Sequence, residues 1–167
     1  MNLEYTHVTH TFAPVYDERS RILILGSFPS VKSREQNFYY GHPQNRFWKV
    51  LAGIYEENVP ATIKEKQDLL LAHQIAVWDV IDSCDIVGSS DSSIRNVVPN
   101  EMDRVLSHAT IQAIYANGEK AYKLFMKYCQ GDGQPPIYKL PSTSPANAAC
   151  RLERLIEIWG EKIAKTY

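Results

Sequence analysis

The chain has 167 residues and a formal net charge of −1, with 44% hydrophobic and 22% charged residues. These values are ordinary for a globular protein that can bury a hydrophobic core, and they do not indicate a broad basic surface for nucleic acid. No apolar stretch approaches the roughly 20 residues of a membrane span. The N-terminus also lacks the basic and apolar regions of a secretory signal. We therefore expect one domain over residues 1–167, in the cytoplasm, with no membrane partner.

The cysteines and histidines give no sign of a metal centre. Cys84, Cys129 and Cys150 are widely spaced and form no C-x-x-C pair, so we expect reduced thiols. The five histidines lack metal-ligand spacing such as H-E-x-x-H. We expect no metal and no cofactor.

Strands and helices alternate along the chain. After a surface arm (1–21), apolar runs predict strands at 22–26, 75–81, 111–116 and 137–140. Helical patterns are expected at 45–57, 62–74, 101–108, 118–128 and about 146–165, with long loops at 27–43 and 82–100. This order predicts an α/β fold, a doubly wound sandwich on a small four-stranded parallel sheet.

Each predicted strand ends in polar or special residues. In a parallel sheet these ends lie on one edge, where ligands bind. The segments are Ser27 with the Tyr40–Asn45 loop, the 82–100 loop, Asn117-Gly118, and Ser142-Thr143-Ser144. The chain lacks the glycine-rich phosphate loops and the G-x-S-x-G nucleophile motif. One composite site built from four loops is therefore expected.

Five segments together resemble a known family. They are GSFPS (26–30), YYGHPQNRFWKVL (39–51), VWDVIDSCDIVGSSDSSI (77–94), ANGEKAYKLF (116–125) and LPSTSPANA (140–148). The set resembles the uracil-DNA glycosylase superfamily, and within it most closely the hypoxanthine-DNA glycosylase family. The resemblance implies a three-layer α/β/α sandwich with a four-stranded parallel sheet.

The resemblance also implies an activity. It is that of a monofunctional DNA glycosylase in base excision repair, which hydrolyses the N-glycosidic bond of a deaminated base. The base that the resemblance implies is hypoxanthine, in deoxyinosine. The base leaves the stack of double- or single-stranded DNA and enters a pocket, and the transition state resembles an oxocarbenium ion. None of the site residues that the resemblance implies is a lysine, so strand cleavage through a Schiff base is not implied. A monomer is the default expectation.

The resemblance gives Asn45 the catalytic role of positioning water. Other branches of the superfamily have Asp or Asn at the position of Phe28, which can do no polar chemistry. A neutral amide is a poor base, so much of the catalysis would come from stabilising the departing purine. The competing interpretation is that Asn45 caps the following helix.

The base-binding residues implied are Tyr40, Asn117, His42, Ser27 and Phe28. Tyr40 would stack on the base, and the Asn117 amide would match the carbonyl and the N–H of hypoxanthine. The alternatives are a partly buried tyrosine and a turn asparagine before glycine. His42 could bind base or phosphate, or be structural.

Phosphate and stack contacts are implied at the last loop. Ser142, Thr143 and Ser144 would hold phosphate beside the last helix, or form a turn and a cap. Ala146 and Asn147 lie where relatives insert a residue into the stack, but neither is a large wedge. Leu140 replaces a polar residue of related enzymes.

Three other functions stay open at this point. The substrate could be uracil or a mismatched base. The fold could carry a nucleic-acid-binding module without catalysis, for which Phe28 is the best support. It could also carry a small-molecule enzyme, because a fold does not fix a function.

Overall fold

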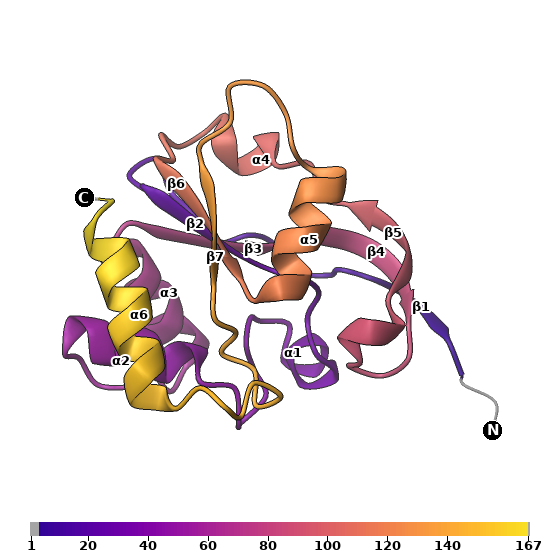
Figure 1. Ribbon diagram of the computed structural model, residues 1–167, viewed down its shortest axis with the longest axis horizontal. Helices are drawn as coiled ribbons and strands as arrows, with labels where there is room; N and C mark the ends of the chain where they lie inside the picture. The colour runs from indigo at the N-terminus through magenta and orange to yellow at the C-terminus, as the bar shows by residue number, and fades with distance from the viewer. Residues whose placement is uncertain (1–3, 167) are drawn as a thin grey trace.

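A parallel sheet of four strands forms the centre of the molecule. The structure is a computed structural model and describes residues 4–166. The sheet order is β3 (Ile75–Asp79), β2 (Ile22–Gly26), β6 (Ala113–Asn117) and β7 (Ile137–Leu140). All three pairings are parallel, which confirms the predicted α/β sheet (Figure 1).

The register brings the four carboxyl ends to one level. Gly26 pairs with Asp79, and Asn117 pairs with Leu140. On the other side of β2, Leu25 pairs with Ala116. β2 and β3 are buried along their whole length, as expected of strands covered on both faces. Polar groups that follow β2 and β3 therefore meet solvent where these two strands end.

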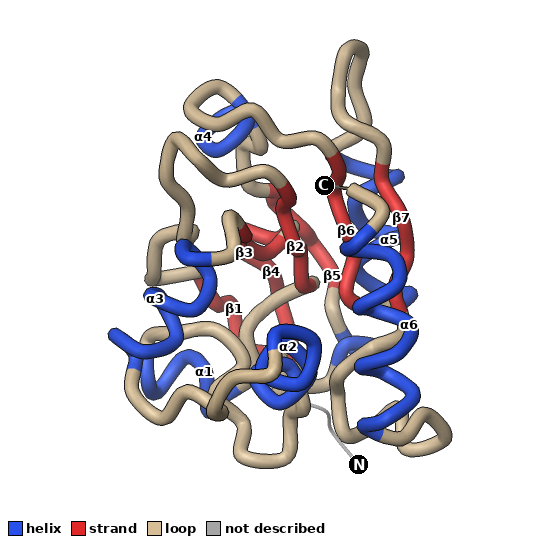
Figure 2. The backbone as a smooth tube through the Cα atoms, turned by 90° about the vertical axis from the view of Figure 1, so that its left-hand side faces the viewer, coloured by secondary structure: helices blue, strands red, loops and turns tan. Residues whose placement is uncertain are grey.

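Helices cover the sheet on both sides. They are α1 (Val31–Gln36), α2 (Phe47–Tyr55), α3 (Ile63–Ala72), α4 (Asp103–Leu106), α5 (Glu119–Tyr128) and α6 (Leu152–Ala164). In Figure 1, α2, α3 and α6 gather to the left of the strands and α5 lies to the right. Figure 1 shows β7 between α6 and α5, and Figure 2 shows α2 below the strand ends. This arrangement confirms the three-layer sandwich. No described helix has the length and apolarity to cross a bilayer.

A second sheet corrects two predictions. β1 (Thr6–Thr9), β4 (Ile81–Ile86) and β5 (Arg95–Pro99) form an antiparallel sheet in the order β1-β4-β5. The predicted arm at 1–21 and loop at 82–100 are therefore partly strand, with a short 3₁₀ turn at Asp91–Ser93. β1 and β5 keep much of their length in solvent, so their polar composition hid them, whereas β4 is mostly buried.

The predicted strand at 75–81 divides between the two sheets. β3 ends at Asp79, and Val80 alone separates it from β4. The Val80 amide donates to the Gly26 carbonyl and the Ile81 amide to that of Ser27, at 2.9 and 3.2 Å. The chain thus follows β2 past its end before it enters the second sheet.

Two helices begin where the sequence did not predict them. α1 forms inside the expected loop at 27–43, and the Ser30 hydroxyl caps it by accepting from the Ser33 amide at 3.2 Å. The last helix begins at Leu152 rather than near 146. The hydroxyls of Ser142 and Ser144 accept from backbone amides two residues ahead, and such local bonds compete with helix formation.

The crossing of α2 and α6 yields a stability prediction. A Cβ at Gly160 would lie 3.5 Å from Ile54, an ordinary contact, whereas a Cβ at Gly53 would lie 2.4 Å from Ile156. We expect Gly160→Ala to raise the free energy of unfolding by about 1 kcal/mol, because alanine favours the helix. Gly53→Ala should gain less or lose stability, because Ile156 must move. Urea denaturation of both variants measures the difference; a Gly53→Ala protein more stable than Gly160→Ala would contradict this packing.

Candidate active site

A cavity of about 260 Å³ lies at the carboxyl edge of the parallel sheet. Most of the predicted site residues line it: Ser27, Phe28, Tyr40, His42, Asn45, Asn117, Ser142, Thr143 and Ser144. Ala146 and Asn147 do not line it. The four loops named from the sequence therefore do build one composite pocket.

Asn45 is fixed through its side-chain oxygen. Its Oδ1 accepts from the Phe47 amide and from the Thr143 hydroxyl, each at 2.9 Å. The first bond is the capping contact at the start of α2 that was the competing interpretation. Because both bonds use Oδ1, the Nδ2 group remains, and it makes no hydrogen bond within residues 4–166. Asn45 can therefore cap the helix and still offer a donor to the pocket.

Thr143 connects Asn45 to Asn117. The Asn117 oxygen accepts from the Thr143 amide, and Asn117 Nδ2 donates to the Thr143 hydroxyl, both at 3.0 Å. The Thr143 hydroxyl then donates to Asn45. Thr143 is fully buried, so in this structure its hydroxyl is not presented to a phosphate. The chain of bonds fixes both amides, and a fixed site costs less reorganisation during reaction.

Arg46 holds the loop between β7 and α6. Its guanidinium donates to the carbonyl oxygens of Thr143 at 3.3 Å, Ser144 at 2.8 Å and Asn147 at 3.1 Å, and to that of Cys150. Its backbone amide also donates to Thr143 at 3.0 Å. The planar fork of arginine suits several acceptors at once. Arg46 therefore gives the loop one shape.

The aromatic residues of the same motif shape the opposite wall. Tyr40 has a left-handed backbone with φ of 53°, a costly conformation that often marks functional sites. Its ring stacks on Phe47 with centroids 4.0 Å apart. The Trp48 indole donates to the Tyr39 carbonyl at 3.2 Å, which anchors the turn before Tyr40. One face of the Tyr40 ring is thus already used inside the protein.

Burial acts strongly on the Tyr40 phenol. Its hydroxyl is buried without a regular hydrogen bond, close to Asp79 and to the Asn117 amide. Burial first, and then the charge of Asp79, raise its pKa far above the usual range, and the Asn117 contact offsets this only in part. The phenol therefore stays protonated at the base of the pocket.

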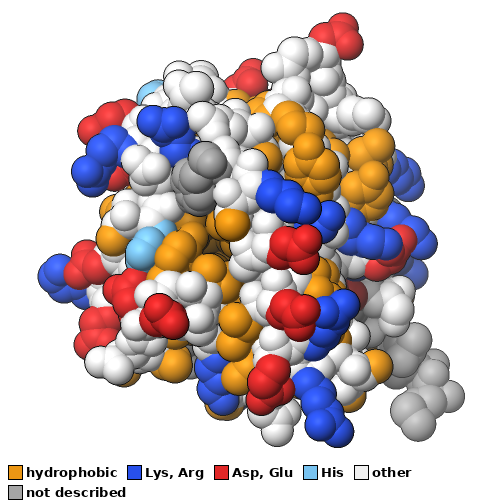
Figure 3. Space-filling model, turned by 60° about the vertical axis from the view of Figure 1, so that its left-hand side comes forward, with side chains coloured by type: hydrophobic (Ala, Val, Ile, Leu, Met, Phe, Trp, Pro, Cys, Tyr) orange, Lys and Arg blue, Asp and Glu red, His pale blue; other side chains and the backbone are white. Residues whose placement is uncertain are grey.

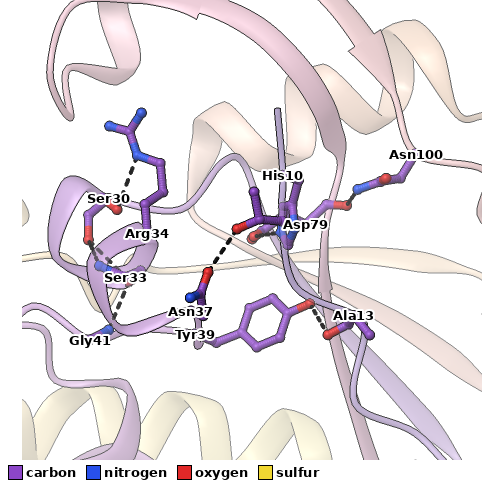
Figure 4. A network of polar contacts seen from close by, with 11 residues as sticks. His10, Ala13, Ser30, Ser33, Arg34, Asn37, Tyr39, Gly41, Asp79 and Asn100 are labelled. Atoms are coloured by element: carbon purple, nitrogen blue, oxygen red, sulfur yellow. Dashed lines mark hydrogen bonds and ion pairs between the residues drawn. The ribbon is translucent and has the colours of Figure 1, made fainter. Parts of the chain in front are cut away.

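The strand-to-helix connection is tied down by α1. The Gly41 amide donates to the Ser33 hydroxyl at 2.9 Å, and Ser30 donates to the same hydroxyl at 3.1 Å (Figure 4). The Tyr39 hydroxyl donates to the Ala13 carbonyl at 2.8 Å. These bonds fix the start of the loop that carries Tyr40, His42 and Asn45, and the bonds of Asn45 fix its end.

Two carboxylates missed by the sequence analysis as site residues line the pocket. Asp79, at the end of β3, is paired with His10 at 2.8 Å, with 5% and 2% of their side chains exposed (Figure 4). Asp91, from the rim of the second sheet, accepts from the Ser27 hydroxyl at 3.1 Å. Desolvation raises the pKa of Asp91, and the Ser27 bond acts against that shift. No lysine or arginine is among the described residues that line the cavity.

The remaining predicted residues lie around the rim. His42 Nδ1 accepts from the Gln44 amide at 3.1 Å, so in the neutral ring Nε2 carries the proton and is a donor. The hydroxyl hydrogens of Ser142 and Ser144 are free to donate, since their oxygens accept from backbone amides. The Asn147 amide group donates to the Ser142 carbonyl at 3.0 Å and so closes the loop. Ala146 is exposed.

Charge is mixed on the surface shown in Figure 3. Lysine and arginine side chains alternate with aspartate and glutamate on this face of the molecule. Such a face has no uniform positive field. Within the described part of the chain there is also no cluster of three potential metal-ligating side chains.

Comparison with known families agrees with this geometry. The family model described as the uracil DNA glycosylase superfamily matches residues 13–161. The chain belongs to the uracil DNA glycosylase superfamily. The predicted membership and the expected kind of activity, that of a DNA glycosylase with DNA as its substrate, are thereby confirmed.

Proteins from two Methanosarcina species are similar to this chain over most of their length. A protein named hypoxanthine DNA glycosylase from Methanosarcina acetivorans is 36% identical over 138 residues, covering 81% of this chain and 86% of its own. Its namesake from Methanosarcina barkeri is 33% identical over 112 residues, covering 66% and 71%. A solution NMR structure of a candidate uracil DNA glycosylase from Methanosarcina acetivorans has a TM-score of 0.76 at 33% identity, with coverage of 90% and 92%.

Arg46 yields a second prediction. Arg46→Lys keeps the charge but cannot reach four carbonyl groups, so we expect a loss of about 2 kcal/mol in the free energy of unfolding. Amide hydrogen exchange should rise across residues 143–150. The control is Arg154→Lys, because Arg154 makes an exposed pair with Glu157 that contributes little. Equal stability and unchanged exchange in the two variants would show that Arg46 does not hold the loop.

Proposed function

We propose that this glycosylase excises hypoxanthine from deoxyinosine in DNA by monofunctional hydrolysis of the N-glycosidic bond. The observation that carries the proposal is the pair of fixed amides, Asn45 and Asn117, joined through Thr143 at the wall of a base-sized pocket. The cavity is at the small end of ligand sites, which suits a single base. The names of the two Methanosarcina relatives support hypoxanthine as that base.

Asn45 acts as the catalytic residue in this proposal. Because its Oδ1 is engaged, the Nδ2 group would donate to the attacking water and hold it at the anomeric carbon. An oxocarbenium-like sugar is a strong electrophile, so positioned water needs little help from a base. The absence of a carboxylate at Phe28 is compatible with this route.

The pocket favours positive charge. Asp79 and Asp91 are the described carboxylates of its wall, and no described cation lines the cavity with them. A sugar that gains positive charge in the transition state is stabilised by such carboxylates, more strongly than in water. The same charges disfavour departure of the purine as an anion. We therefore infer that hypoxanthine leaves as the neutral base: the attacking water gives its hydroxyl to the anomeric carbon as the bond to the purine nitrogen breaks, and its released proton reaches the purine through solvent.

The extruded base would enter between Tyr40 and Phe28 and meet Asn117 at the base of the pocket. His42 and the hydroxyls of Ser27, Ser142 and Ser144 supply donors around the rim for base or phosphate. Ala146 is exposed on the same loop and would contact the opened stack. A flipped base in duplex DNA, a monomer and a place in the cytoplasm are parts of this proposal.

A single-turnover assay on labelled duplexes tests the function. Each duplex carries one deoxyinosine, deoxyuridine or deoxyxanthosine, and hot alkali cuts any abasic site. We expect cleavage at deoxyinosine only after alkali, because no Schiff base forms. Cleavage at deoxyuridine alone would replace hypoxanthine by uracil, which the NMR relative's name favours. DNA binding without abasic sites would indicate a non-catalytic module.

Asn45 is tested by two substitutions. Asn45→Ala should slow excision about 100-fold or more, as expected when a positioning group for the nucleophile is lost. Asn45→Asp keeps an oxygen for the Phe47 amide and the Thr143 hydroxyl, so we expect wild-type stability. It has no donor, so its excision rate should still fall at least tenfold by the same measure. A wild-type rate for Asn45→Asp would refute the donor role of Nδ2.

A further inference from the structure

Asp79 has one carboxylate oxygen without a hydrogen bond. Its Oδ2 accepts from His10 Nε2 at 2.8 Å, and only 5% of its side chain is exposed. Its Oδ1 makes no hydrogen bond to any residue within 4–166, and Asp79 lines the pocket. A carboxylate oxygen that faces a pocket and has no donor from the protein can accept a hydrogen bond from a ligand. The oxygen is therefore placed for a donor supplied by a ligand.

Gly26 leaves space beside this oxygen. Asp79 pairs with Gly26 across β3 and β2. Asn117 follows Ala116, the partner of Leu25, so it is level with Gly26 on the opposite side. A Cβ at Gly26 would lie 2.5 Å from Asp79 Oδ1 and 3.1 Å from the Tyr40 hydroxyl. Because Gly26 has no side chain, a gap is left between the Asp79 carboxylate and the Asn117 amide. The strands that carry these two residues lie on either side of β2, two strand spacings apart.

The two sides of the gap have opposite hydrogen-bonding character. Asn117 uses its oxygen and one Nδ2 hydrogen on Thr143. Its other Nδ2 hydrogen is near the Tyr40 oxygen but makes no regular hydrogen bond with it, so it can donate to a ligand. Asp79 offers an acceptor. The buried Tyr40 hydroxyl adjoins both groups and remains protonated, so it adds no second negative charge. An edge with a donor beside an acceptor is complementary to this pair.

We propose that Asp79 is the specificity-determining residue that accepts from the N1–H of hypoxanthine, while Asn117 donates to the 6-carbonyl oxygen. This inference rests on the proposed function and deepens it. Adenine presents the reverse pattern, a lone pair at N1 and an amino group at C6. Its lone pair would face the Asp79 carboxylate, and a site built to bond a donor rejects a base that lacks one. Deamination itself is the change that the pair recognises.

His10 is the positioning residue for this carboxylate. A carboxylate only accepts, so Nε2 of His10 carries the proton of their bond. The His10 ring packs 4.4 Å from Phe12 and 5.9 Å from Tyr39, centroid to centroid, which fixes its direction. Asp79 Oδ2 is held by His10, and Oδ1 is thereby directed to the gap.

The test compares free bases as inhibitors of excision. Hypoxanthine, 1-methylhypoxanthine and adenine compete against the labelled duplex with wild-type protein and with Asp79→Asn, which is nearly isosteric and can still accept from His10. Asp91→Asn is the matched control, because it removes the other carboxylate of the pocket. Thermal denaturation checks that each variant is folded.

We expect wild-type protein to bind hypoxanthine at least tenfold more tightly than adenine or 1-methylhypoxanthine. Asp79→Asn should weaken the binding of hypoxanthine about 10- to 100-fold, since one charged hydrogen bond is lost. The binding of adenine should be unchanged or tighter. Asp91→Asn should change the affinity for all three bases by the same factor. The idea is overturned if wild-type protein does not prefer hypoxanthine, or if Asp79→Asn weakens every base equally. The wild-type preference is decisive even if Asp79→Asn does not fold.

Failure of the proposed function gives a different result. If wild-type protein excises deoxyuridine alone, the same competition is run with uracil and cytosine, whose edges differ in the same way at N3 and C4. A preference for uracil that Asp79→Asn removes would support the role of Asp79 while hypoxanthine is rejected as the substrate. No preference would overturn both.

Discussion

The hydrogen bonds between Thr143 and the two asparagines are the constraint on which the site depends. Thr143 lies on the loop between β7 and α6, and it contacts Asn45 before α2 and Asn117 at the end of β6. These three segments are far apart in sequence, and they share one pocket because a buried threonine satisfies both amides. Arg46 keeps that threonine in place through the loop carbonyls. The hydrogen bonds of Thr143 therefore determine both the shape of the pocket and the position of its two amide groups.

The motif HPQNRFW gains a physical explanation from these contacts. Asn45 caps α2 and faces the pocket, and Arg46 holds the opposite loop. Phe47 supports the Tyr40 ring, and Trp48 anchors the Tyr39 carbonyl. Four consecutive residues at the start of α2 thus contact four different parts of the structure around the pocket. A change at any of them would disturb a different wall of the same cavity.

The sequence predicted the central sheet and most of the pocket lining, and the reasons are clear. Apolar runs such as Ile22–Gly26 can only be buried, and the polar residues after them must then share an edge. The second sheet was missed because β5 is largely exposed and reads as loop. Asp79 was missed as a site residue because it ends an apolar strand, and only the register with Gly26 shows what it faces. Arg46 was missed because its partners are backbone carbonyl groups, which leave no pattern in a sequence.

The junction at Val80 has a consequence for how this architecture can vary. The chain passes from the parallel sheet to the antiparallel sheet across a single residue, so the two sheets divide the pocket between them. The parallel sheet supplies the rigid floor with Gly26, Asp79 and Asn117, and the hairpin of β4 and β5 supplies the wall with Asp91. Changes of length at the hairpin tip, near Gly88, would reshape that wall and leave the floor intact. A change of length at the hairpin tip would thus alter which substrates fit the pocket without moving the floor residues that face the base edge.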